Sequence, residues 1–536
     1  MQTILFFTPY TPWLPHTLWE TTMGHALRQR GHTVHFLTCS GLPNCGMAPM
    51  PMENHEAVCQ HCRDFSCNVL PRLRHTAEYF QLALTGKEKA EIEDWAQALS
   101  VAELDTACYA GLPLGQWTRA DIISRWHTLE PQMDRPEVVE SYRLLLIGAA
   151  MAAAALPRIY DRQNPSVVVT LNGSFFLNRV AVEIARARGI RVILHERGWM
   201  DNTVGFITSG IAGDMAGYQE RWDAWKDIPL SASELEAVAA LLHQRRRGVN
   251  MNWSAFSPLQ NSKQDREQIN TMLGMQDRPL ALLCTSSDCE GSLADRARAI
   301  DQREWIAQTV DWFYTNPQFN LVVRVHPNEA DHALTDDRVL HWYRALVDRL
   351  DSNPSDNVRI ILPDEKISTY TLMDVAAVGL SYGSTAGLEM ACQGIPLVHA
   401  GMGYYKDCGF THEIRSAADI PGVMAHVMDL NRCSETQRLA FRFMQRLFID
   451  ICVPFSKVKI SRNYFQAELV YQSIAELAPG RDPHLDRIAE YILGSAPLYA
   501  APTAAESARS VCAEDAFFAG QNTGNLITTE DTEKRN

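Results

Sequence analysis

The sequence lacks three features that would set it apart from ordinary globular proteins. Its longest apolar run, Leu144 to Leu156, has 13 residues and is too short to span a bilayer. The segment Met1 to Thr8 has no basic stretch and no cleavage site, so we expect no secretory signal and a cytoplasmic location. No internal repeat of solenoid period is present.

Positive charge is also scarce. The 536 residues carry 49 Lys and Arg against 63 Asp and Glu, a formal net charge of −14. This balance argues against a nucleic-acid partner, although a local basic patch could still hold a phosphate. It also disfavours docking of amphipathic segments between about 75 and 135 on a membrane surface, although peripheral association with the inner membrane stays open. With 46% hydrophobic and 21% charged residues, the composition is that of a folded globular chain.

Apolar runs alternate with helical patterns in two series. In the first series the predicted strands are Thr3–Thr8, His32–Thr38, Ser166–Leu171 and Arg191–His195. In the second they are Pro279–Thr285, Asn320–Val325, Val358–Leu362, Val375–Ser381 and Ile395–Val398. Near-continuous apolar runs are typical of parallel strands covered on both faces. A strong helix is predicted over Glu137–Leu156, stopped by Pro157.

The two series predict an α/β chain with two doubly wound halves. Ligands bind beyond the carboxyl ends of the strands in such sheets, so chemistry is expected in the loops that follow the strands. The predicted parts are a first domain at 1–250 with a Cys-rich loop (39–67) and a helical insertion (about 75–135), a second domain at 265–430, helices at 431–495 and a disordered tail at 500–536.

A segment rich in glycine and hydroxyls follows the predicted strand that ends at Ser381. Gly383, Ser384 and Thr385 stand where a helix is expected to begin, so free backbone N–H groups and the positive end of the helix dipole lie beside two hydroxyls. That arrangement suits a phosphate or diphosphate. Glu389 lies about one turn further on, where it could accept from ribose hydroxyls. The alternative is an ordinary N-cap.

A histidine ends a neighbouring strand. His326 follows Arg324, which we count among the nucleotide-binding residues, and Pro327 fixes the chain just beyond. An imidazole there could donate to a leaving phosphate or protonate it, because its pKa is near neutral. The alternative is a histidine that only caps the strand end.

An acidic loop follows the first strand of the second series. It carries the carboxylates Asp288 and Glu290, then Gly291, after the hydroxyls of 285–287. A polar turn would have the same composition, so this loop gains its meaning from the order of the three segments.

In that order the segments resemble the donor half of bacterial capsule polysaccharide glycosyltransferases. That group includes the β-Kdo transferases and, more remotely, the polysialyltransferases and the CDP-glycerol glycerophosphotransferases. The resemblance covers about residues 280–410, with Cys289 interrupting the acidic pair and Thr385 in place of a second serine. It implies a GT-B fold, in which two Rossmann-like, doubly wound parallel-sheet domains face a central cleft and the second holds the nucleotide-sugar. The motif residues are Asp288, Glu290, Gly291, His326, Pro327, Ser384 and Thr385.

The resemblance implies transfer of a sugar from a CMP- or UDP-linked donor to a growing surface or capsule polysaccharide or a glycolipid. Ser384 and Thr385 would bind the donor phosphate and His326 would stabilise the leaving nucleotide, so no cofactor is required for the chemistry. Three alternatives stay open: a CDP-glycerol-type phosphotransferase, a UDP-GlcNAc 2-epimerase-like enzyme, and a non-catalytic glycan-binding or scaffold partner in polysaccharide synthesis.

The first half is expected to offer the acceptor site and the catalytic base. Glu20 follows the first strand together with His16, and Glu196 follows a later strand. Either carboxylate could deprotonate an acceptor hydroxyl. The alternatives are helix capping by Glu20 and an arginine-paired structural role for Glu196. The loop Gly401–Tyr405 could close over the sugar, or be a surface loop with buried tyrosines.

Five of the 13 cysteines fall between residues 39 and 67. Cys59 and Cys62 form a C-x₂-C pair, and Cys39 and Cys45 lie upstream. Four thiolates could hold one structural zinc beside the cleft. The alternatives are free core thiols or a redox pair.

Overall fold

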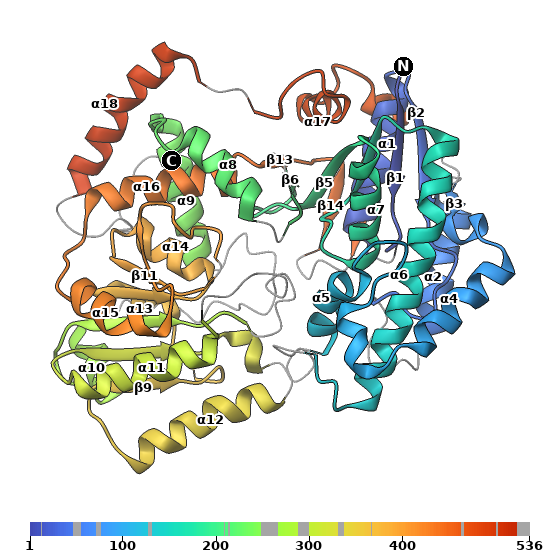
Figure 1. Ribbon diagram of the computed structural model, residues 1–536. Helices are drawn as coiled ribbons and strands as arrows, with labels where there is room; N and C mark the ends of the chain where they lie inside the picture. Colours follow the sequence, from blue (N-terminus) through green and yellow to red (C-terminus); the bar gives the residue numbers. More distant parts are fainter. Residues whose placement is uncertain are drawn as a thin grey trace. The chain divides into compact units, whose positions relative to one another are not determined.

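The computed structural model describes most of the chain (Figure 1). The described residues are 1–11, 13–46, 55–70, 77–126, 131–207, 210–212, 215–247, 266–287, 300–330, 337–365, 367–401, 403–461, 466–499 and 502–521. The chain divides into two compact units. The first contains Met1–Gly217 and Ile451–Ala500, and the second contains Tyr218–Asp288, Arg296–Asp450 and Ala501–Asn536.

A seven-stranded sheet forms the centre of the first unit, in the order β13-β6-β5-β4-β1-β2-β3. The strands are β1 (Thr3–Phe7), β2 (Thr33–Thr38), β3 (Ala77–Tyr79), β4 (Val167–Leu171), β5 (Arg191–Arg197), β6 (Thr203–Ile207) and β13 (Cys452–Pro454). The five strands β1 to β5 run parallel, whereas β6 is antiparallel to β5 and β13 is antiparallel to β6. Phe7 at the end of β1 aligns with Leu37 of β2 and Thr170 of β4, so these carboxyl ends lie side by side.

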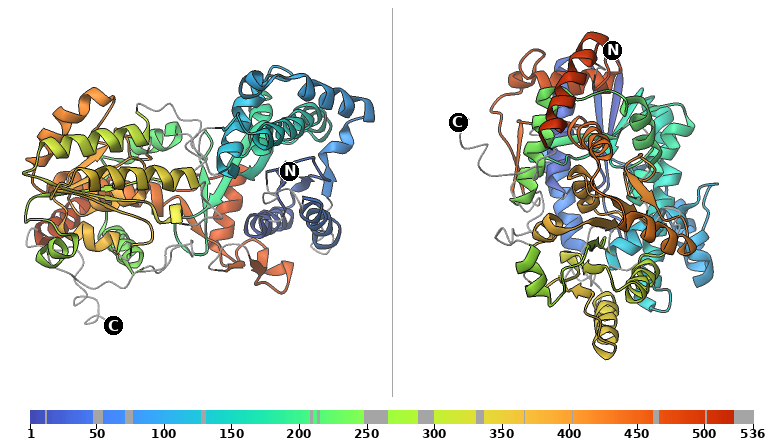
Figure 2. Two further views of the ribbon diagram at one scale, coloured as in Figure 1. Left: turned by 90° about the horizontal axis from the view of Figure 1, so that it is seen from below. Right: turned by 90° about the vertical axis from the view of Figure 1, so that its left-hand side faces the viewer.

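Alternate residues of β1 face two different helical layers, as the pleat of a strand requires. Leu5 and Phe7 pack into one buried cluster with α6 and α7, and Ile4 and Phe6 pack into another with α1 and α17. Helices therefore cover both faces of the sheet (Figure 2). The helices are α1 (Leu14–Gln29), α2 (His55–Asp64), α4 (Gly86–Ala98), α5 (Leu114–Trp126), α6 (Pro136–Gln163), α7 (Phe176–Ala187) and α17 (Pro483–Leu493), with short 3₁₀- or π-helical segments η2 (Phe65–Val69), η3 (Phe80–Ala83), η4 (Val101–Thr106) and η9 (Ile474–Leu477).

The chain returns to the first unit near its end. Strand β13 pairs with β6 (Figure 1), and a small hairpin follows, formed by β14 (Val458–Ile460) and β15 (Ala467–Leu469). Val453 and Ile488 of this segment pack in the same buried cluster as Ile4 of β1. The expectation of helices throughout 431–495 is therefore corrected: residues 451–500 add strands and one helix to the first unit.

The second unit is built on a six-stranded sheet in the order β12-β11-β10-β7-β8-β9, and all its strands run parallel. The strands are β7 (Leu280–Cys284), β8 (Asn320–Arg324), β9 (Val358–Ile361), β10 (Val378–Ser381), β11 (Leu397–His399) and β12 (Thr411–Glu413). Val378 and Leu380 of β10 pack in a cluster with α11, α12 and α15, whereas Gly379 between them faces Met390 of α14. This sheet too is covered on both faces.

The second unit begins with helices that precede its sheet and ends with one that follows it. Its helices are α8 (Met215–Trp225), whose first three residues fall in the first unit, α9 (Ala232–Arg246), α10 (Arg266–Leu273), α11 (Gln302–Thr315), α12 (Asp337–Ser352), α13 (Thr369–Val375), α14 (Thr385–Cys392), α15 (Ile420–Met428), α16 (Ser434–Met444) and α18 (Ala504–Gln521), with short 3₁₀- or π-helical segments η6 (Pro327–Ala330), η7 (Ala417–Asp419) and η8 (Gln445–Ile449). Helix α18 falls in the segment expected to be disordered, and the buried Glu514 anchors it to Arg442 of α16. Residues 218–247 belong to this unit, so the boundary lies before the expected one at 250.

The α/β class is confirmed, with two mostly parallel sheets covered by helices. Every predicted strand exists within a few residues of its expected bounds. The prediction that Pro157 ends the long helix is wrong, because α6 continues to Gln163 and ends at Asn164, whose φ is +46°. Packing of α6 in the core outweighs the one backbone hydrogen bond that a proline removes.

Helix α6 is, in the described part of the chain, long and apolar enough to cross a membrane. In its most apolar 18-residue stretch, however, 72% is buried inside the protein. The core helix of a globular unit has this composition for the same physical reason, since it faces apolar side chains on most sides.

Candidate functional site

Each sheet has one point at which the strand order reverses. In the second unit it lies between β7 and β10, and in the first between β1 and β4. Ligands of doubly wound sheets bind beyond the carboxyl ends of the strands at such a point. The predicted catalytic and nucleotide-binding residues that the structure describes lie at or after the carboxyl ends of these four strands or of their direct neighbours, and Glu196 and Arg324 are still part of β5 and β8.

Helix α14 follows β10 in the chain. Gly383 and Ser384 therefore lie at the edge of the second sheet that is formed by the carboxyl ends of its parallel strands. Ser384 is the N-cap residue, and its Oγ accepts a hydrogen bond from Ala386 N at 3.3 Å. The hydroxyl therefore acts as an N-cap, as the alternative interpretation held. The N-cap role uses a lone pair, so the hydroxyl hydrogen can still donate to an anion at this helix end.

Ser286, in the loop after β7, faces the same glycine. A Cβ placed on Gly383 would lie 3.5 Å from Ser286 Oγ. Ser286 is only 3% exposed, and its Oγ has no hydrogen-bond partner in the described part of the chain. Its backbone is held by Gln302, which accepts from Ser286 N at 2.8 Å and donates to Ser286 O at 3.2 Å. A buried hydroxyl without a partner is costly, and a polar ligand at Gly383 would satisfy it.

A buried tyrosine, Tyr405, holds the start of α14 in place through hydrogen bonds. Tyr405 donates to Ser384 O at 2.6 Å and lies 2.8 Å from Ser381 Oγ, and burial raises its pKa. The next turn needs glycine, because a Cβ on Gly387 would come within 2.4 Å of the Tyr405 hydroxyl. Tyr405 thus supports the loop, which agrees with the alternative of buried tyrosines for Gly401–Tyr405.

The loop after β11 is tied down by a histidine. His399 is fully buried, and its Nε2 accepts from Gly403 N at 3.0 Å. The proton therefore sits on Nδ1, which lies 2.9 Å from Glu413 and donates to it. Burial raises the pKa of Glu413, but the hydrogen bonds from His399, Thr411 and Asp407 N lower it overall.

Thr385 and Glu389 share a partner that the sequence analysis missed. Arg245, near the end of α9, donates from Nη2 to Thr385 Oγ1 at 3.0 Å and from Nε to Glu389 Oε1 at 2.8 Å. The Glu389 side chain is only 4% exposed. Glu389 was predicted as a ribose contact, and in this structure its carboxylate instead holds a guanidinium.

His326 lies at the end of β8, beside β7, as expected. The backbone N–H of His326 donates to Thr285 Oγ1 at 2.9 Å, and this hydrogen bond joins the loops of the two strands. Burial, with a smaller contribution from Arg324, lowers the pKa of His326 to about 4. The ring is therefore neutral near pH 7 in the free protein, and it can donate a hydrogen bond but not act as a charged acid.

Arg324 does not point toward α14. Its Nη1 donates to Leu362 O at 2.6 Å, at the end of β9 on the far side of β8, and burial lowers its pKa. The predicted acidic residues Asp288, Glu290 and Gly291 lie outside the described residues. Just before them, Ser287 Oγ donates to the buried Glu329 at 3.0 Å.

At the edge of the first sheet, two carboxylates meet two histidines. Glu20 of α1 and His195 of β5 are almost completely buried, and Glu20 Oε1 lies 2.8 Å from His195 Nε2. In the described part of the chain, Glu20 Oε2 and His195 Nδ1 have no hydrogen-bond partner. Glu20 does not cap its helix, since α1 begins six residues earlier.

Glu196 is the more accessible carboxylate, with 35% of its side chain exposed. It accepts from Asn172 Nδ2 at 2.7 Å and from Arg197 N at 2.7 Å, so its position is fixed from β4 and β5. His16 Nε2 lies 3.5 Å from Glu196 Oε1. Burial, together with His195 and Arg197, lowers the pKa of His16 well below 6.5, so this contact joins a neutral imidazole to a carboxylate.

The cysteines predicted to hold zinc have other partners. Cys39 Sγ accepts from Gln81 Nε2 at 3.0 Å, and burial raises the pKa values of Cys39 and Cys62 to about 12. Burial also raises the pKa of Cys59. No group of three or more His, Cys, Asp or Glu residues is placed to hold a metal ion in the part of the chain that the structure describes, which includes Cys45. The geometry therefore gives the predicted zinc site no support.

No protein-family model and no curated protein matches the chain. Among solved structures it is similar to KpsC, a β-Kdo 2,4 transferase of Thermosulfurimonas dismutans, with 15% identity and a TM-score of 0.36 over 59% of this chain and 87% of that one. It is also similar to the UDP-GlcNAc 2-epimerase of Methanocaldococcus jannaschii in complex with UDP-GlcNAc and UDP, with 10% identity and a TM-score of 0.28 over 83% of this chain and 98% of that one. A third similar structure is the UDP co-structure of S. aureus MnaA, with 10% identity and a TM-score of 0.29 over 94% of this chain and 99% of that one. Because each TM-score lies below 0.5, the description of two α/β units is based on the chain's own strand order and not on these similarities.

Proposed function

We propose that this protein is a glycosyltransferase that takes its sugar from a nucleotide-activated donor. The observation that carries the proposal is the edge of the second sheet, where the start of α14 lies beside the Ser286 hydroxyl, which has no hydrogen-bond partner among the described residues. Backbone N–H groups and hydroxyls at a helix N-terminus suit a phosphate. The donor phosphate would bind there, with Ser384 and Thr385 donating to it.

The neutral His326 fits the departure of the nucleotide. As the bond between the anomeric carbon and the phosphate oxygen breaks, the electron pair stays on the phosphate. A hydrogen bond from the imidazole N–H and the positive end of α14 would stabilise that charge. We expect no divalent ion to be needed for this step.

The edge of the first sheet fits the activation of the acceptor. Glu196 is accessible and is oriented by Asn172, so it would take the proton of an acceptor hydroxyl as that oxygen attacks the anomeric carbon. Glu20 would act through His195, as a positioning residue that fixes the ring beside His16.

The order of the motifs supports a finer proposal. A histidine–proline pair on one strand end and a serine–threonine pair on another resemble capsule polysaccharide glycosyltransferases. We therefore propose a CMP- or UDP-linked donor and a surface or capsule polysaccharide or glycolipid as acceptor, handled in the cytoplasm.

The test follows the products from three donors: CMP-Kdo, UDP-GlcNAc and CDP-glycerol, each with and without oligosaccharide acceptors. The proposal expects nucleotide release with growth of the acceptor by one sugar, detected by mass spectrometry. Conversion of UDP-GlcNAc to its 2-epimer without acceptor would identify an epimerase, and a new phosphodiester would identify a phosphotransferase. No reaction and no nucleotide binding would leave a non-catalytic partner.

A matched pair of variants accompanies the assay. Ser384→Ala removes the N-cap hydroxyl of α14, and Ser473→Ala removes a comparable one at η9 in the first unit, whose Oγ accepts from Ala475 N at 3.2 Å. Both should lose about 1 kcal/mol of stability. Only Ser384→Ala should weaken nucleotide binding.

A further inference from the structure

A cation reaches the first turn of α14 from a helix distant in sequence. Arg245 is the second-last residue of α9, and its guanidinium contacts both Thr385, the first residue of α14, and Glu389, one turn further in. The forked contact fixes the plane of the guanidinium at this helix end.

The N-terminus of a helix is a poor place for a positive charge, because the helix dipole is positive there. Arg245 is only 13% exposed, so water screens its charge weakly. Glu389 balances the charge, and Tyr370 forms hydrogen bonds to both partners. A buried pair of this kind is expensive to desolvate and adds little stability by itself. An anion at the start of α14 would be attracted by both the positive end of the helix dipole and the guanidinium of Arg245.

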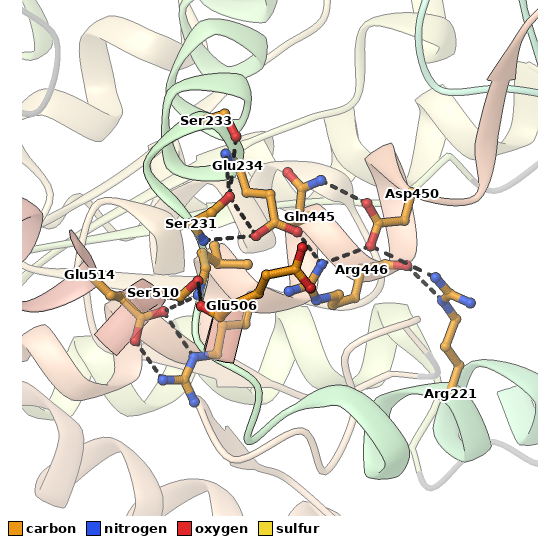
Figure 3. A network of polar contacts seen from close by, with 12 residues as sticks. Arg221, Ser231, Ser233, Glu234, Gln445, Arg446, Asp450, Glu506, Ser510 and Glu514 are labelled. Carbon is orange, nitrogen blue, oxygen red and sulfur yellow. Dashed lines mark hydrogen bonds and ion pairs between the residues drawn. The ribbon is translucent and has the colours of Figure 1, made fainter. Parts of the chain in front are cut away.

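The other end of α9 is held by a network of polar contacts (Figure 3). Ser231 caps the helix and exchanges hydrogen bonds with Glu234, which also pairs with Arg446. Glu514 of α18 accepts from Leu230 N at 3.1 Å, just before the cap. Because the start of the helix is fixed in this way, its far end presents Arg245 from a rigid element.

A second, independent feature points to a ligand at the same place. The buried hydroxyl of Ser286 has no partner among the described residues and lies beside Gly383, which directly precedes the N-cap. A phosphate at the helix end would accept from that hydroxyl.

We propose that Arg245 binds the phosphate of the nucleotide, and that Glu389 and Tyr370 are positioning residues that hold its guanidinium. This inference rests on the proposed nucleotide site. It gives Glu389 a role other than the ribose contact predicted from the sequence.

Calorimetric titration tests the inference with UDP against uridine and CMP against cytidine. The variant Arg245→Gln should weaken nucleotide binding about 10- to 100-fold, since a charge-assisted bond to phosphate is lost, and should leave any nucleoside binding unchanged. Arg245→Lys keeps the charge without the fork and should lose less. The matched control is Arg246→Gln, because Arg246 lies next in α9 and pairs with Asp374, with Nη1 at 2.7 Å from Oδ1. It should lose similar stability and keep nucleotide affinity.

The outcomes separate the two levels of the argument. If the wild type binds no nucleotide, the proposed function fails. If the wild type binds and Arg245→Gln binds equally well, Arg245 serves only to join α9 to α14 and the inference is overturned. Should Arg245→Gln not fold, equal affinity of Arg245→Lys and Glu389→Gln to wild type would overturn it instead. If Glu389→Gln weakens nucleoside and nucleotide binding alike, Glu389 is a ribose contact and its positioning role is wrong.

Discussion

At the point where the first sheet reverses its strand order, carboxylates and imidazoles pair with one another, whereas at the same point of the second sheet hydroxyls surround a helix N-terminus. Both edges are formed by parallel strands in the order 3-2-1-4-5, counted within each unit. The backbone is therefore not what distinguishes them.

The difference lies in how each edge treats charge. Glu196 is an accessible carboxylate and Glu20 a buried one, and the histidines beside them are largely buried. The second edge offers hydrogen-bond donors and the cation of Arg245, which suit an anion. One topology has thus been given two chemistries, and function follows the side chains rather than the fold.

The largest effect is expected from the accessible carboxylate of the first edge. Glu196→Gln should lower the rate of sugar transfer about 10²- to 10⁴-fold, because a general base contributes on that scale. Nucleotide affinity should not change, since the nucleotide belongs to the second edge. Steady-state kinetics and calorimetry check the two parts. Glu183→Gln, which removes an ion pair with Arg179 on α7 of the same unit, is the control and should leave the rate unchanged.

The buried pair of the first edge should matter for stability. Glu20→Gln replaces a carboxylate whose side chain is 2% exposed and forms a hydrogen bond with His195. The free energy of unfolding should therefore fall by about 1–3 kcal/mol. Urea unfolding measures this. Glu88→Gln, at the solvent-screened ion pair with Arg158, should cost less than Glu20→Gln. Equal losses in the two variants would contradict the burial argument.

The pH dependence of stability carries a signature of the second edge. The pKa of His326 is about 4 in the folded protein against an ordinary 6.5. As the pH falls from about 6.5 toward 4, the unfolded chain takes up a proton that the folded protein does not, so stability decreases. At pH 5 this amounts to about 1–2 kcal/mol. His16 acts in the same direction. His326→Gln should show a smaller loss than wild type between pH 7 and pH 5, and an identical loss would exclude the shifted pKa.

The smallest effect is expected at Ser286. Its hydroxyl lacks a partner among the described residues, so Ser286→Ala should leave stability nearly unchanged and weaken nucleotide binding about 5-fold. Its neighbour Ser287 donates to the buried Glu329. Ser287→Ala should therefore lower stability and leave nucleotide binding nearly unchanged. Calorimetry with UDP and thermal unfolding compare the two serines, and equal affinity of Ser286→Ala and wild type would remove the hydroxyl from the site.

The strands could be predicted from the sequence because buried parallel strands appear as unbroken apolar runs. The strands β3, β6 and β12 to β15 were missed. Three of them, β3, β12 and β15, contain no buried residue and therefore show no apolar run. Pro157 misled the prediction of α6, where core packing outweighs a local rule.

The candidate site was predicted in part for a related reason. The positions of the strand ends follow from the predicted strands, and these positions placed Ser384, His326 and Glu196 at the two edges. Arg245 could not be found, because it lies near the end of a charged helix whose direction is set by contacts distant in sequence. The burial of Glu389 was invisible for the same reason.

Titration of UDP, CMP and CDP into wild type, Ser384→Ala and Glu196→Gln most directly tests the division of roles between the two edges. We predict that wild type and Glu196→Gln bind one of these nucleotides equally well, and that Ser384→Ala binds it much more weakly. Weaker binding by Glu196→Gln with unchanged binding by Ser384→Ala would contradict this division, and would place the nucleotide at the edge of the first sheet.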